Sequence, residues 1–553
     1  MSDYQEIIRS LRKDHFLSPN GKNAGRLLAL IGITLKSAID HQGEEPIYHV
    51  ENPHKSIYQI AAEARIPDQP AGNLKALLAT ISEHLGGSVI AHDPFMAKNI
   101  IPLPDFSYLA AYVAASLYMP NGVTGEDAAA VLNTEIACAS ALAKLAGYNF
   151  NRSAGIFTFG GTGTNFYALK LGLMKAAPDH NLKGLGSIPL VVIGTRSSHY
   201  CHQTSSNWLG IGQDNYLQAS TNLDQTTRLD DLERLCRQAI AEGKRIACIE
   251  ALGGTTSNMA IDDIETICHL RDSLVSDYKL DYTPHVHVDS VVGWAYLFFK
   301  DYDFDANPLG FSPRVLEKVK MVYSHISKVK YADSFGVDFH KTGYTPYVSS
   351  MIIAKDQKDF KLLRRDAGIM TPLFHNDSVY NPGVFTLETS RSAANMLATW
   401  YVMQALGRDG YRSLLGHSLE MSFLMRDELS QYEETGLYAV NREHFGCDIF
   451  VRCYPASTVP HETYQRELDD DQILENNTAY NNRFAKWFLQ KKQAGPSRIS
   501  LSKSSAAFYN NNGKPVVALR IYSLNPNLDQ IAATEMIARL AAAKREFDAS
   551  SQS

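Results

Sequence analysis

Between Gly155 and Ile353 the sequence alternates short apolar, β-branched runs with longer segments of helical periodicity. Strands are expected over residues 156–159, 190–193, 246–250, 285–289, 321–323, 334–339 and 348–353. Helices are expected between them, over residues 166–176, 229–242 and 261–270. Such alternation implies crossover connections and a mainly parallel sheet covered by helices on both faces. The sequence therefore predicts an α/β fold with a seven-stranded sheet, whose ligands lie at strand ends.

The flanking sequence predicts further units. At 553 residues the chain exceeds one ordinary hydrophobic core, and usual domain sizes suggest roughly two to four units. We expect a helical N-terminal segment over residues 1–105, a large domain over 106–390 and a small α+β C-terminal domain over 391–553. Further helices are expected over residues 57–64, 74–85, 108–117, 135–147 and 390–406. Asparagine clusters between residues 476 and 513 predict turns and exposed loops.

Composition and charge argue against several classes of protein. Lys and Arg total 53 against 59 Asp and Glu, and the net charge of −6 gives no basic field for nucleic acid. The opening MSDYQEIIRSLRKDHF is charged where a secretory signal needs an apolar core, and later apolar runs are broken by charges before membrane-spanning length. The seven cysteines form no CxxC pair, so neither disulfides nor structural zinc is indicated. We expect a cytoplasmic protein with no nucleic-acid or membrane partner.

A glycine-rich turn, GGTGTN at residues 160–165, stands between the strand-like GIFTF and the helix-like FYALKLGLMKAA. A helix that begins there offers free backbone N–H groups and a positive dipole end to an anion. The Walker pattern fails because no lysine follows the last glycine, and the dinucleotide pattern fails because Phe166 stands where it needs glycine. The turn is thus a candidate phosphate site, with a purely structural turn as the alternative.

The run HVHVDS at residues 285–290 alternates polar and apolar residues, which puts His285, His287 and Asp289 on one face of a strand. Two histidines and a carboxylate could hold zinc or iron, with HYCH at residues 199–202 as a source of further ligands. A metal site would leave the phosphate turn and the next motif unexplained, so it ranks second. A half-buried strand with satisfied polar groups ranks third.

The stretch DSFGVDFHKTGY at residues 333–344 ends a strand-like run with His340 and Lys341. A free lysine, with a pKa of about 10.4, is a poor nucleophile near neutral pH unless its surroundings or an imine change that. A cofactor that carries a phosphate, a pyridine nitrogen and an aldehyde needs one partner of each kind. The turn, Asp289 and Lys341 together meet that need.

These motifs, in this order, resemble the group II pyridoxal-phosphate-dependent amino-acid decarboxylases, the family of glutamate, aromatic amino-acid and bacterial tyrosine decarboxylases. The match spans about residues 92–411 and rests on GGTGTN, SSHY, GGTTSNMAIDDIETI, HVDS, ADSFGVDFHKTGYTPY and TLETSRSAANMLATWYVMQALGRDGY. The resemblance implies a fold-type I architecture, pyridoxal 5'-phosphate as cofactor, and a homodimer with active sites at the subunit interface. Bacterial tyrosine decarboxylases look most similar.

The resemblance also implies a role for each matching residue. Lys341 forms the Schiff base with the cofactor aldehyde. Asp289 pairs with the pyridine nitrogen and keeps it protonated, so that the ring accepts electrons. His199 stacks on the ring face. Four residues complete the cofactor site, two in the phosphate turn, one before the lysine and one beneath the ring: Thr162, Gly163, His340 and Thr255.

Two positions depart from the family pattern. Ser290 replaces the alanine usual after HVD, and its hydroxyl needs a partner. In TPLFHNDSVY, residues 371–380, Pro372 stands where relatives carry a tyrosine thought to protonate the α-carbon. The proton donor is then expected to be His375, Tyr380 or another group.

The expected activity is decarboxylation of an L-amino acid, with an aromatic or large apolar side chain favoured by the likeness to tyrosine decarboxylases. An aldehyde synthase or another carbon–carbon lyase is an alternative, because a missing proton donor leaves time for reaction with oxygen. A catalytically inactive relative and a metal-dependent hydrolase built on the HVHVD histidines are further alternatives.

Overall fold

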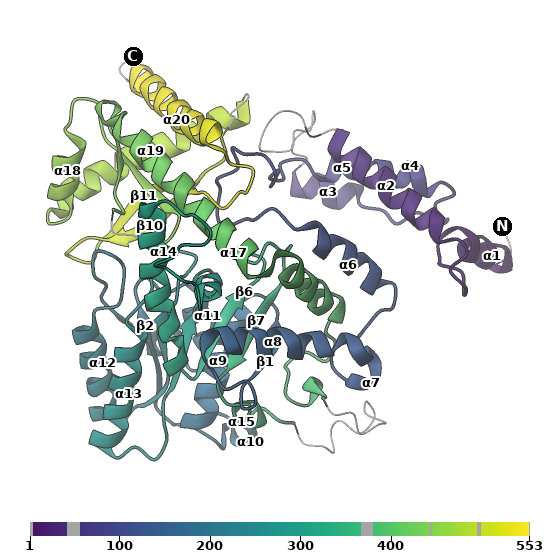
Figure 1. The fold of residues 1–553 in the computed structure, drawn as a ribbon, viewed down its shortest axis with the longest axis horizontal. Helices are drawn as coiled ribbons and strands as arrows, with labels where there is room; N and C mark the ends of the chain where they lie inside the picture. Colours follow the sequence, from purple (N-terminus) through teal and green to yellow (C-terminus); the bar gives the residue numbers. More distant parts are fainter. Residues whose placement is uncertain are drawn as a thin grey trace. The chain divides into compact units, whose positions relative to one another are not determined.

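The computed structural model describes residues 4–40, 42, 56–365, 380–442, 445–494 and 499–551 (Figure 1). The chain divides into two compact units, one of Met1–Met96 with Lys491–Ser500 and one of Ala97–Gln490 with Leu501–Ser553. The three domains expected from the sequence, with boundaries at residues 105 and 390, stay a prediction.

The first unit is helical in its described part. Its helices are α1 (Tyr4–Asp14), α2 (Ala24–Asp40), α3 (Ile57–Glu63), α4 (Leu74–Ala79) and α5 (Ile81–His84). The helix expected over residues 57–64 is confirmed. The one expected over 74–85 is broken at Thr80, whose backbone leaves the helical region.

The second unit contains a seven-stranded sheet in the order β1-β7-β6-β5-β4-β2-β3. Its strands are β1 (Ala154–Thr158), β2 (Leu190–Thr195), β3 (Tyr216–Ala219), β4 (Arg245–Leu252), β5 (His285–Asp289), β6 (Ser334–Asp338) and β7 (Ser350–Ala354). Neighbours from β6 to β3 pair in parallel, whereas β7 runs antiparallel to β1 and β6. The mainly parallel sheet predicted from the sequence is confirmed.

Helices cover both faces of this sheet. On one face Val192 of β2 packs with Leu169 and Leu173 of α9 (Gly161–Ala176). On the other face Val191 and Ile193 join a cluster with α8 (Asn133–Ala146), α12 (Leu229–Ala241), α13 (Ile264–Tyr278) and α14 (Pro313–Ile326). Shorter helices among the described residues of this part are α6 (Phe106–Ser116), α7 (Gly125–Ala128), α10 (His180–Lys183), α11 (Cys201–Trp208) and α15 (Lys358–Lys361).

One expected strand is wrong and one real strand was not expected. Residues 321–323 belong to α14, which begins at a proline and buries Val315, Val319, Val322 and Ile326 at helical spacing. The seventh strand is instead β3, a four-residue edge strand whose sequence YLQA has no alternation long enough to detect.

The C-terminal part combines a second sheet with long helices. Strands β8 (Leu437–Ala439), β9 (Asp448–Cys453), β10 (Ser502–Tyr509) and β11 (Pro515–Tyr522) form an antiparallel sheet in the order β10-β11-β9-β8. The helices are α17 (Ala393–Ser430), α18 (Pro460–Glu467), α19 (Asp471–Ala494) and α20 (Gln530–Ser551). The helix expected to end at Gly407 does bend there, at φ 58°, and a second helical segment follows.

The loops expected over residues 476–513 are confirmed at residues 510–513, which form the turn between β10 and β11, and are wrong where α19 and β10 occupy the range. The asparagines that suggested turns have structural roles. Asn481 lies in α19, accepts a hydrogen bond from the N–H of Cys453 at 2.9 Å and donates one to its carbonyl at 2.8 Å. Among the described helices, no single helix is long and apolar enough to cross a membrane. The bent pair Gly125–Val131 and Asn133–Ala146 reaches that length and apolarity only when its two helices are counted together.

Candidate active site

A cavity of about 200 Å³ lies at the carboxyl ends of the parallel strands. Strand β5 ends there at Asp289, β6 ends at Asp338, and α9 begins there directly after β1. The topology thus brings distant motifs to one edge of the sheet. The residues that line the cavity are Phe159, Gly160, Gly161, Thr162, Asn165, His199, Cys201, Thr256, Asp289, Val291, Asp338, His340, Lys341, Tyr347 and Val348.

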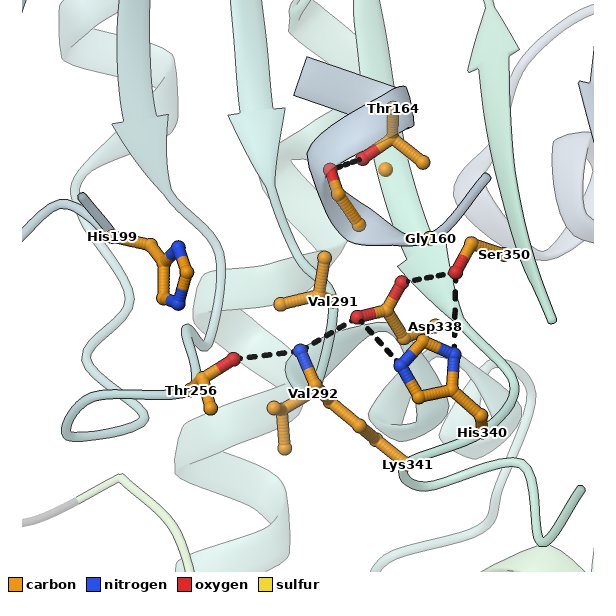
Figure 2. A network of polar contacts seen from close by, with 12 residues as sticks. Gly160, Thr164, His199, Thr256, Val291, Val292, Asp338, His340, Lys341 and Ser350 are labelled. Carbon is orange, nitrogen blue, oxygen red and sulfur yellow. Dashed lines mark hydrogen bonds and ion pairs between the residues drawn. The ribbon is translucent and has the colours of Figure 1, made fainter. Parts of the chain in front are cut away.

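Lys341 is held by two polar neighbours at the cavity wall (Figure 2). Its Nζ donates a hydrogen bond to Thr256 Oγ1 at 2.6 Å and lies 2.6 Å from Asp338 Oδ2. The lysine side chain is 11% exposed and the aspartate 1%. Asp338 is held in turn by Ser350, whose hydroxyl donates to Oδ1 at 2.5 Å. The amine is therefore fixed in direction, in a place mostly shielded from water.

The first turn of α9 forms another wall. The N–H groups of Gly161 and Thr162 precede the first intrahelical hydrogen bond, which Gly163 makes to Gly160, so they are available to an anion. A Cβ on Gly161 would lie 2.8 Å from Asp338 Oδ2 and 3.1 Å from Val291 Cγ1. Glycine is therefore required for the close approach at this turn.

His340 lies beside Lys341 and is turned toward the neighbouring strand. Its Nδ1 is 2.8 Å from the carbonyl oxygen of Ser349, and its Nε2 is 3.6 Å from Asp338 Oδ2. Burial lowers the pKa of His340 from its usual value. A neutral ring with Nδ1–H donated to the carbonyl fits these contacts.

Asp289 is buried and accepts three hydrogen bonds. Oδ2 accepts from His202 Nε2 at 3.0 Å and from Asn165 Nδ2 at 3.4 Å, while Oδ1 accepts from the N–H of Val291 at 3.4 Å. Burial alone would raise the pKa of Asp289, but the hydrogen bond and charge of His202, helped by Lys341, hold it well below its usual range. Asp289 therefore carries a negative charge into the cavity.

His199 lies in the loop between β2 and α11 and presents its ring to the same cavity (Figure 2). Burial lowers the pKa of His199 to about 4, although the charge of Asp289 opposes this. The imidazole is therefore neutral near pH 7. A neutral aromatic ring suits contact with another flat ring better than a hydrated cation does.

Of the residues expected at the site, Gly163, Thr255 and Tyr380 are not among those that line the cavity. Thr255 is fully buried beside the cavity, with its hydroxyl 3.5 Å from Asn258 Oδ1, and the neighbouring Thr256 provides the contact with Lys341. Tyr380 is not among the lining residues, because its hydroxyl donates to Glu135 Oε2 at 3.0 Å. His375 and Pro372 lie outside the described residues.

The Ser290 hydroxyl, expected to need a partner, has one in the neighbouring strand. It donates to the carbonyl of Gly336 at 2.7 Å, and Ser290 is not among the residues that line the cavity. The hydroxyl therefore links β5 to β6 and leaves the polarity of the cavity unchanged.

The histidines of the metal alternative have other partners. His285 Nε2 and His287 Nδ1 lie 2.7 and 2.8 Å from the hydroxyl of Ser334, and His287 Nε2 lies 3.0 Å from Asn165 Oδ1. Burial lowers the pKa of His287 to about 3. Within the described ranges no three side chains of His, Cys, Asp or Glu are grouped so as to hold a metal ion.

Sequence reasoning missed the cavity residues Asn165, Thr256, Asp338 and Tyr347, and the role of His202 behind Asp289. A signal existed for the first three, because each lies inside a motif already noted and one to three residues from a named residue. Asn165 is oriented by His287, which donates to its Oδ1, so the amide nitrogen faces Asp289.

The residues present fit pyridoxal phosphate. A primary amine, a set of free N–H groups at a helix start and a buried ionised carboxylate surround one cavity. Gly161 leaves open the space that a Cβ would fill. These three groups are the partners that an aldehyde, a phosphate and a pyridinium nitrogen require.

Comparison with known proteins agrees with this chemistry. Residues 311–450, which include Lys341, match the family model described as the pyridoxal-dependent decarboxylase conserved domain. The chain is similar to an aspartate 1-decarboxylase of Aliivibrio fischeri, at 24% identity over 73% of this chain and 68% of that protein. It is also similar to an L-tyrosine decarboxylase of Enterococcus faecium, at 26% identity over 47% of this chain and 44% of that protein. This chain thus spans less than half of the second relative.

Among solved structures, Oryza sativa TDC with PLP and tryptamine covers 96% of this chain and 100% of its own, with a TM-score of 0.76 at 13% identity. That likeness shows the fold, and the fold-type I architecture is confirmed. The matched domain and the two relatives confirm the resemblance seen in the motifs. These findings support the group II pyridoxal-phosphate-dependent amino-acid decarboxylases, a family of carboxy-lyases, as the family that this chain resembles.

Proposed function

We propose that this protein decarboxylates an L-amino acid, releasing CO2 and the corresponding amine. The observation that carries the proposal is the pairing of Lys341 and Asp289 in one cavity, with the amine fixed by Asp338 and Thr256 and the carboxylate kept ionised by His202. An inactive relative would not need either arrangement.

Each residue has a task that follows from its contacts. Pyridoxal phosphate, when bound, supplies an electron sink for the charge left at the α-carbon when CO2 departs. Lys341 provides the amine that holds the cofactor aldehyde, and the N–H groups at the start of α9 hold its phosphate. Asp289 keeps a proton on the ring nitrogen, and the neutral ring of His199 covers one face of the site.

The side-chain preference that we propose is aromatic or large and apolar. A second cavity of about 540 Å³ shares Phe159, Tyr347 and Val348 with the first. Aromatic and sulfur-containing side chains contribute to its lining: Tyr108, Tyr112, Phe157, Phe159, Tyr347 and Met396. Within the described lining the only cation is Arg391, which is paired with Glu135 and donates to the carbonyl of Phe157 at 3.0 Å. No free cation is thus offered there to an acidic substrate.

Assays with a panel of L-amino acids test this proposal. Purified protein with pyridoxal phosphate is expected to release CO2 and amine in equal amounts, with kcat/KM for aromatic substrates at least about tenfold above that for aspartate, or ~1.4 kcal/mol. Tyr112→Ala, which opens the second cavity, is expected to lower kcat/KM for aromatic substrates more than for small ones. Absence of CO2 from every amino acid would refute decarboxylation, and a preference for aspartate would refute the aromatic side chain.

The same assays address an aldehyde synthase as a second candidate. The observation that favours it is the hydroxyl of Tyr380, which is bonded to Glu135 and does not reach the cavity lining. An amino acid, O2 and water would then yield aldehyde, CO2, ammonia and H2O2. Oxygen consumption and ammonia release in step with CO2 would select this candidate over simple decarboxylation.

A homodimer in the cytoplasm belongs to the same proposal. Phe106, Tyr118 and Met119, in or just after α6, are 86%, 84% and 84% exposed. Large apolar side chains exposed together are typical of surfaces that bind another protein. They support a second copy of the chain as the partner.

Replacing Gly161 with alanine is expected to weaken cofactor binding while the fold is retained. The new Cβ would lie 2.8 Å from the Asp338 carboxylate and would crowd the turn that holds the phosphate. Titration of apoprotein with pyridoxal phosphate should show an affinity lower by about tenfold or more. Gly25→Ala, whose Cβ would meet no atom within 4 Å, is the matched control and should bind normally.

A further inference from the structure

A buried line of polar side chains continues behind Asp289, away from the cavity. His202, in α11, donates from Nε2 to Asp289 Oδ2 at 3.0 Å, and its Nδ1 lies 2.6 Å from Glu250 Oε1 in β4. The hydroxyl of Tyr216, in β3, donates to Glu250 Oε2 at 2.9 Å. The side chains of His202, Asp289 and Glu250 are at most 2% exposed. The line therefore spans the four strands from β5 to β3 and is buried along its length.

The contacts of His202 fix its charge. An ionised carboxylate only accepts hydrogen bonds, and a neutral imidazole has one N–H and one bare nitrogen. Both ring nitrogens lie within 3.0 Å of a carboxylate oxygen, so a neutral ring would set a lone pair against one of them. The 2.6 Å contact with Glu250 is an ion-pair contact and is not aligned as a hydrogen bond. With Asp289 and Glu250 both ionised, an imidazolium is the ring state that suits both contacts.

The backbone makes room for this arrangement. Gly194 lies in β2, between the strands that carry Tyr216 and Glu250. A Cβ at this position would lie 2.2 Å from the Tyr216 hydroxyl and 3.0 Å from Glu250 Oε2. Any larger residue would separate the two side chains. The glycine is thus independent evidence that the backbone accommodates the contact between these two side chains.

We propose that His202 and Glu250 form a positioning unit that orients the Asp289 carboxylate and keeps it ionised. The imidazolium holds the Asp289 carboxylate in place, and Glu250 offsets the positive charge, so that the three groups together present one net negative charge to the ring nitrogen of the cofactor. Without Glu250 the imidazolium would neutralise Asp289 and weaken its hold on a protonated ring. This role for the unit rests on the proposed function, whereas its charge state does not.

The surroundings of His202 agree with this assignment. Burial lowers its pKa, but Glu250 and Asp289 outweigh burial and raise the pKa well above its usual value. The neighbouring His287 has a pKa lowered to about 3 and stays neutral, although it is buried to the same degree. The titratable groups that face or lie beside His202 are Cys201 and His199 from its own segment, Glu250 from β4, Asp289 and His287 from β5, and Tyr216 from β3.

Nitrogen NMR of apoprotein labelled in its histidine rings tests the charge state without cofactor or turnover. Two protonated nitrogens are expected for His202 between pH 6 and 9, and Glu250→Gln should bring its titration into that range. His285, buried and of lowered pKa, is the internal reference for a neutral ring. A single N–H on His202 throughout that range would overturn the proposal, whatever the outcome of activity assays.

A double-mutant cycle tests the charge balance. Glu250→Gln removes one negative charge and is expected to weaken pyridoxal-phosphate affinity by about tenfold. His202→Gln, which can still donate to Asp289, removes the positive charge and should weaken affinity less than Glu250→Gln does. The double variant restores one net negative charge and should bind within about threefold of the parent. Additive losses in the double variant would mean that the residues act by packing alone and would overturn the proposal. Failure of the parent to bind the cofactor would instead refute the proposed function.

Discussion

Replacing Lys341 with alanine is expected to lower the rate of decarboxylation by at least ~10³-fold, because the enzyme loses the side chain that forms the covalent link to the cofactor. The variant loses the amine that Asp338 and Thr256 direct into the cavity. Reduction with borohydride followed by peptide mass mapping should label residue 341 in the parent and leave the variant unlabelled. Label on a different lysine of the parent would contradict the assignment.

The same substitution changes stability, and a second variant separates the two effects. Alanine leaves the Asp338 carboxylate buried without its cation, which costs about 3 kcal/mol in such sites. Lys341→Arg keeps a positive charge near Asp338 but has no amine for an imine. We expect both variants to be inactive and only the alanine variant to melt at a clearly lower temperature. Lys355→Ala, an exposed lysine after β7, should change neither property.

The parts of the site that could be predicted from sequence are those fixed by strand ends. The carboxyl ends of parallel strands meet at one edge, so a strand that ends at Asp289 and another that leads to Lys341 must bring both residues together. The glycine turn at the start of α9 follows the same rule. These placements depend on topology alone, and the alternation of strands and helices predicts the topology.

The parts that could not be predicted depend on side-chain packing and on short elements. Thr255 and Thr256 are adjacent, and only the local backbone decides that Thr256 meets Lys341. His202 and Glu250 are far apart in sequence, and the sequence around either residue does not indicate that the two are in contact. Residues 321–323 are apolar enough for a strand, but their burial repeats with the period of a helix that extends beyond them. Local sequence therefore fixes the elements better than the contacts among them.

The histidines illustrate how position decides chemistry. His202 and His287 are both fully buried, yet one faces two carboxylates and the other faces an amide and a hydroxyl. Burial removes the charge of His287, whereas the carboxylates preserve that of His202. From sequence both looked like possible metal ligands. The neighbours in space, and not the residue type, give each ring its role.

Asp289→Asn is expected to lower kcat by about 10²–10³-fold, the scale on which loss of one preorganised electrostatic partner is measured. The amide cannot hold a proton on the ring nitrogen, so the ring loses its capacity as an electron sink. Cofactor should still bind through Lys341, and the nitrogen NMR signal of labelled cofactor should move toward neutral pyridine. Asp262→Asn is the matched control, because Asp262 is equally buried but lies outside the cavity lining. An unchanged ring-nitrogen signal in Asp289→Asn would contradict the assigned role.

The pH dependence of stability distinguishes the two aspartates further. The pKa of Asp289 is below its usual value of about 3.9, so its ionisation stabilises the fold above that pH, and this stabilisation is lost as the pH falls toward the folded pKa. Burial raises the pKa of Asp262 to about 6, so its ionisation in the fold has the opposite sign and lowers stability as the pH rises above about 4. Urea titrations from pH 3 to 8 should therefore show that the free energy of unfolding of Asp289→Asn comes closer to that of the parent at low pH. The stability of Asp262→Asn relative to the parent should increase as the pH rises. Parallel curves for the two variants would show that the buried charge of Asp289 is not held by its neighbours.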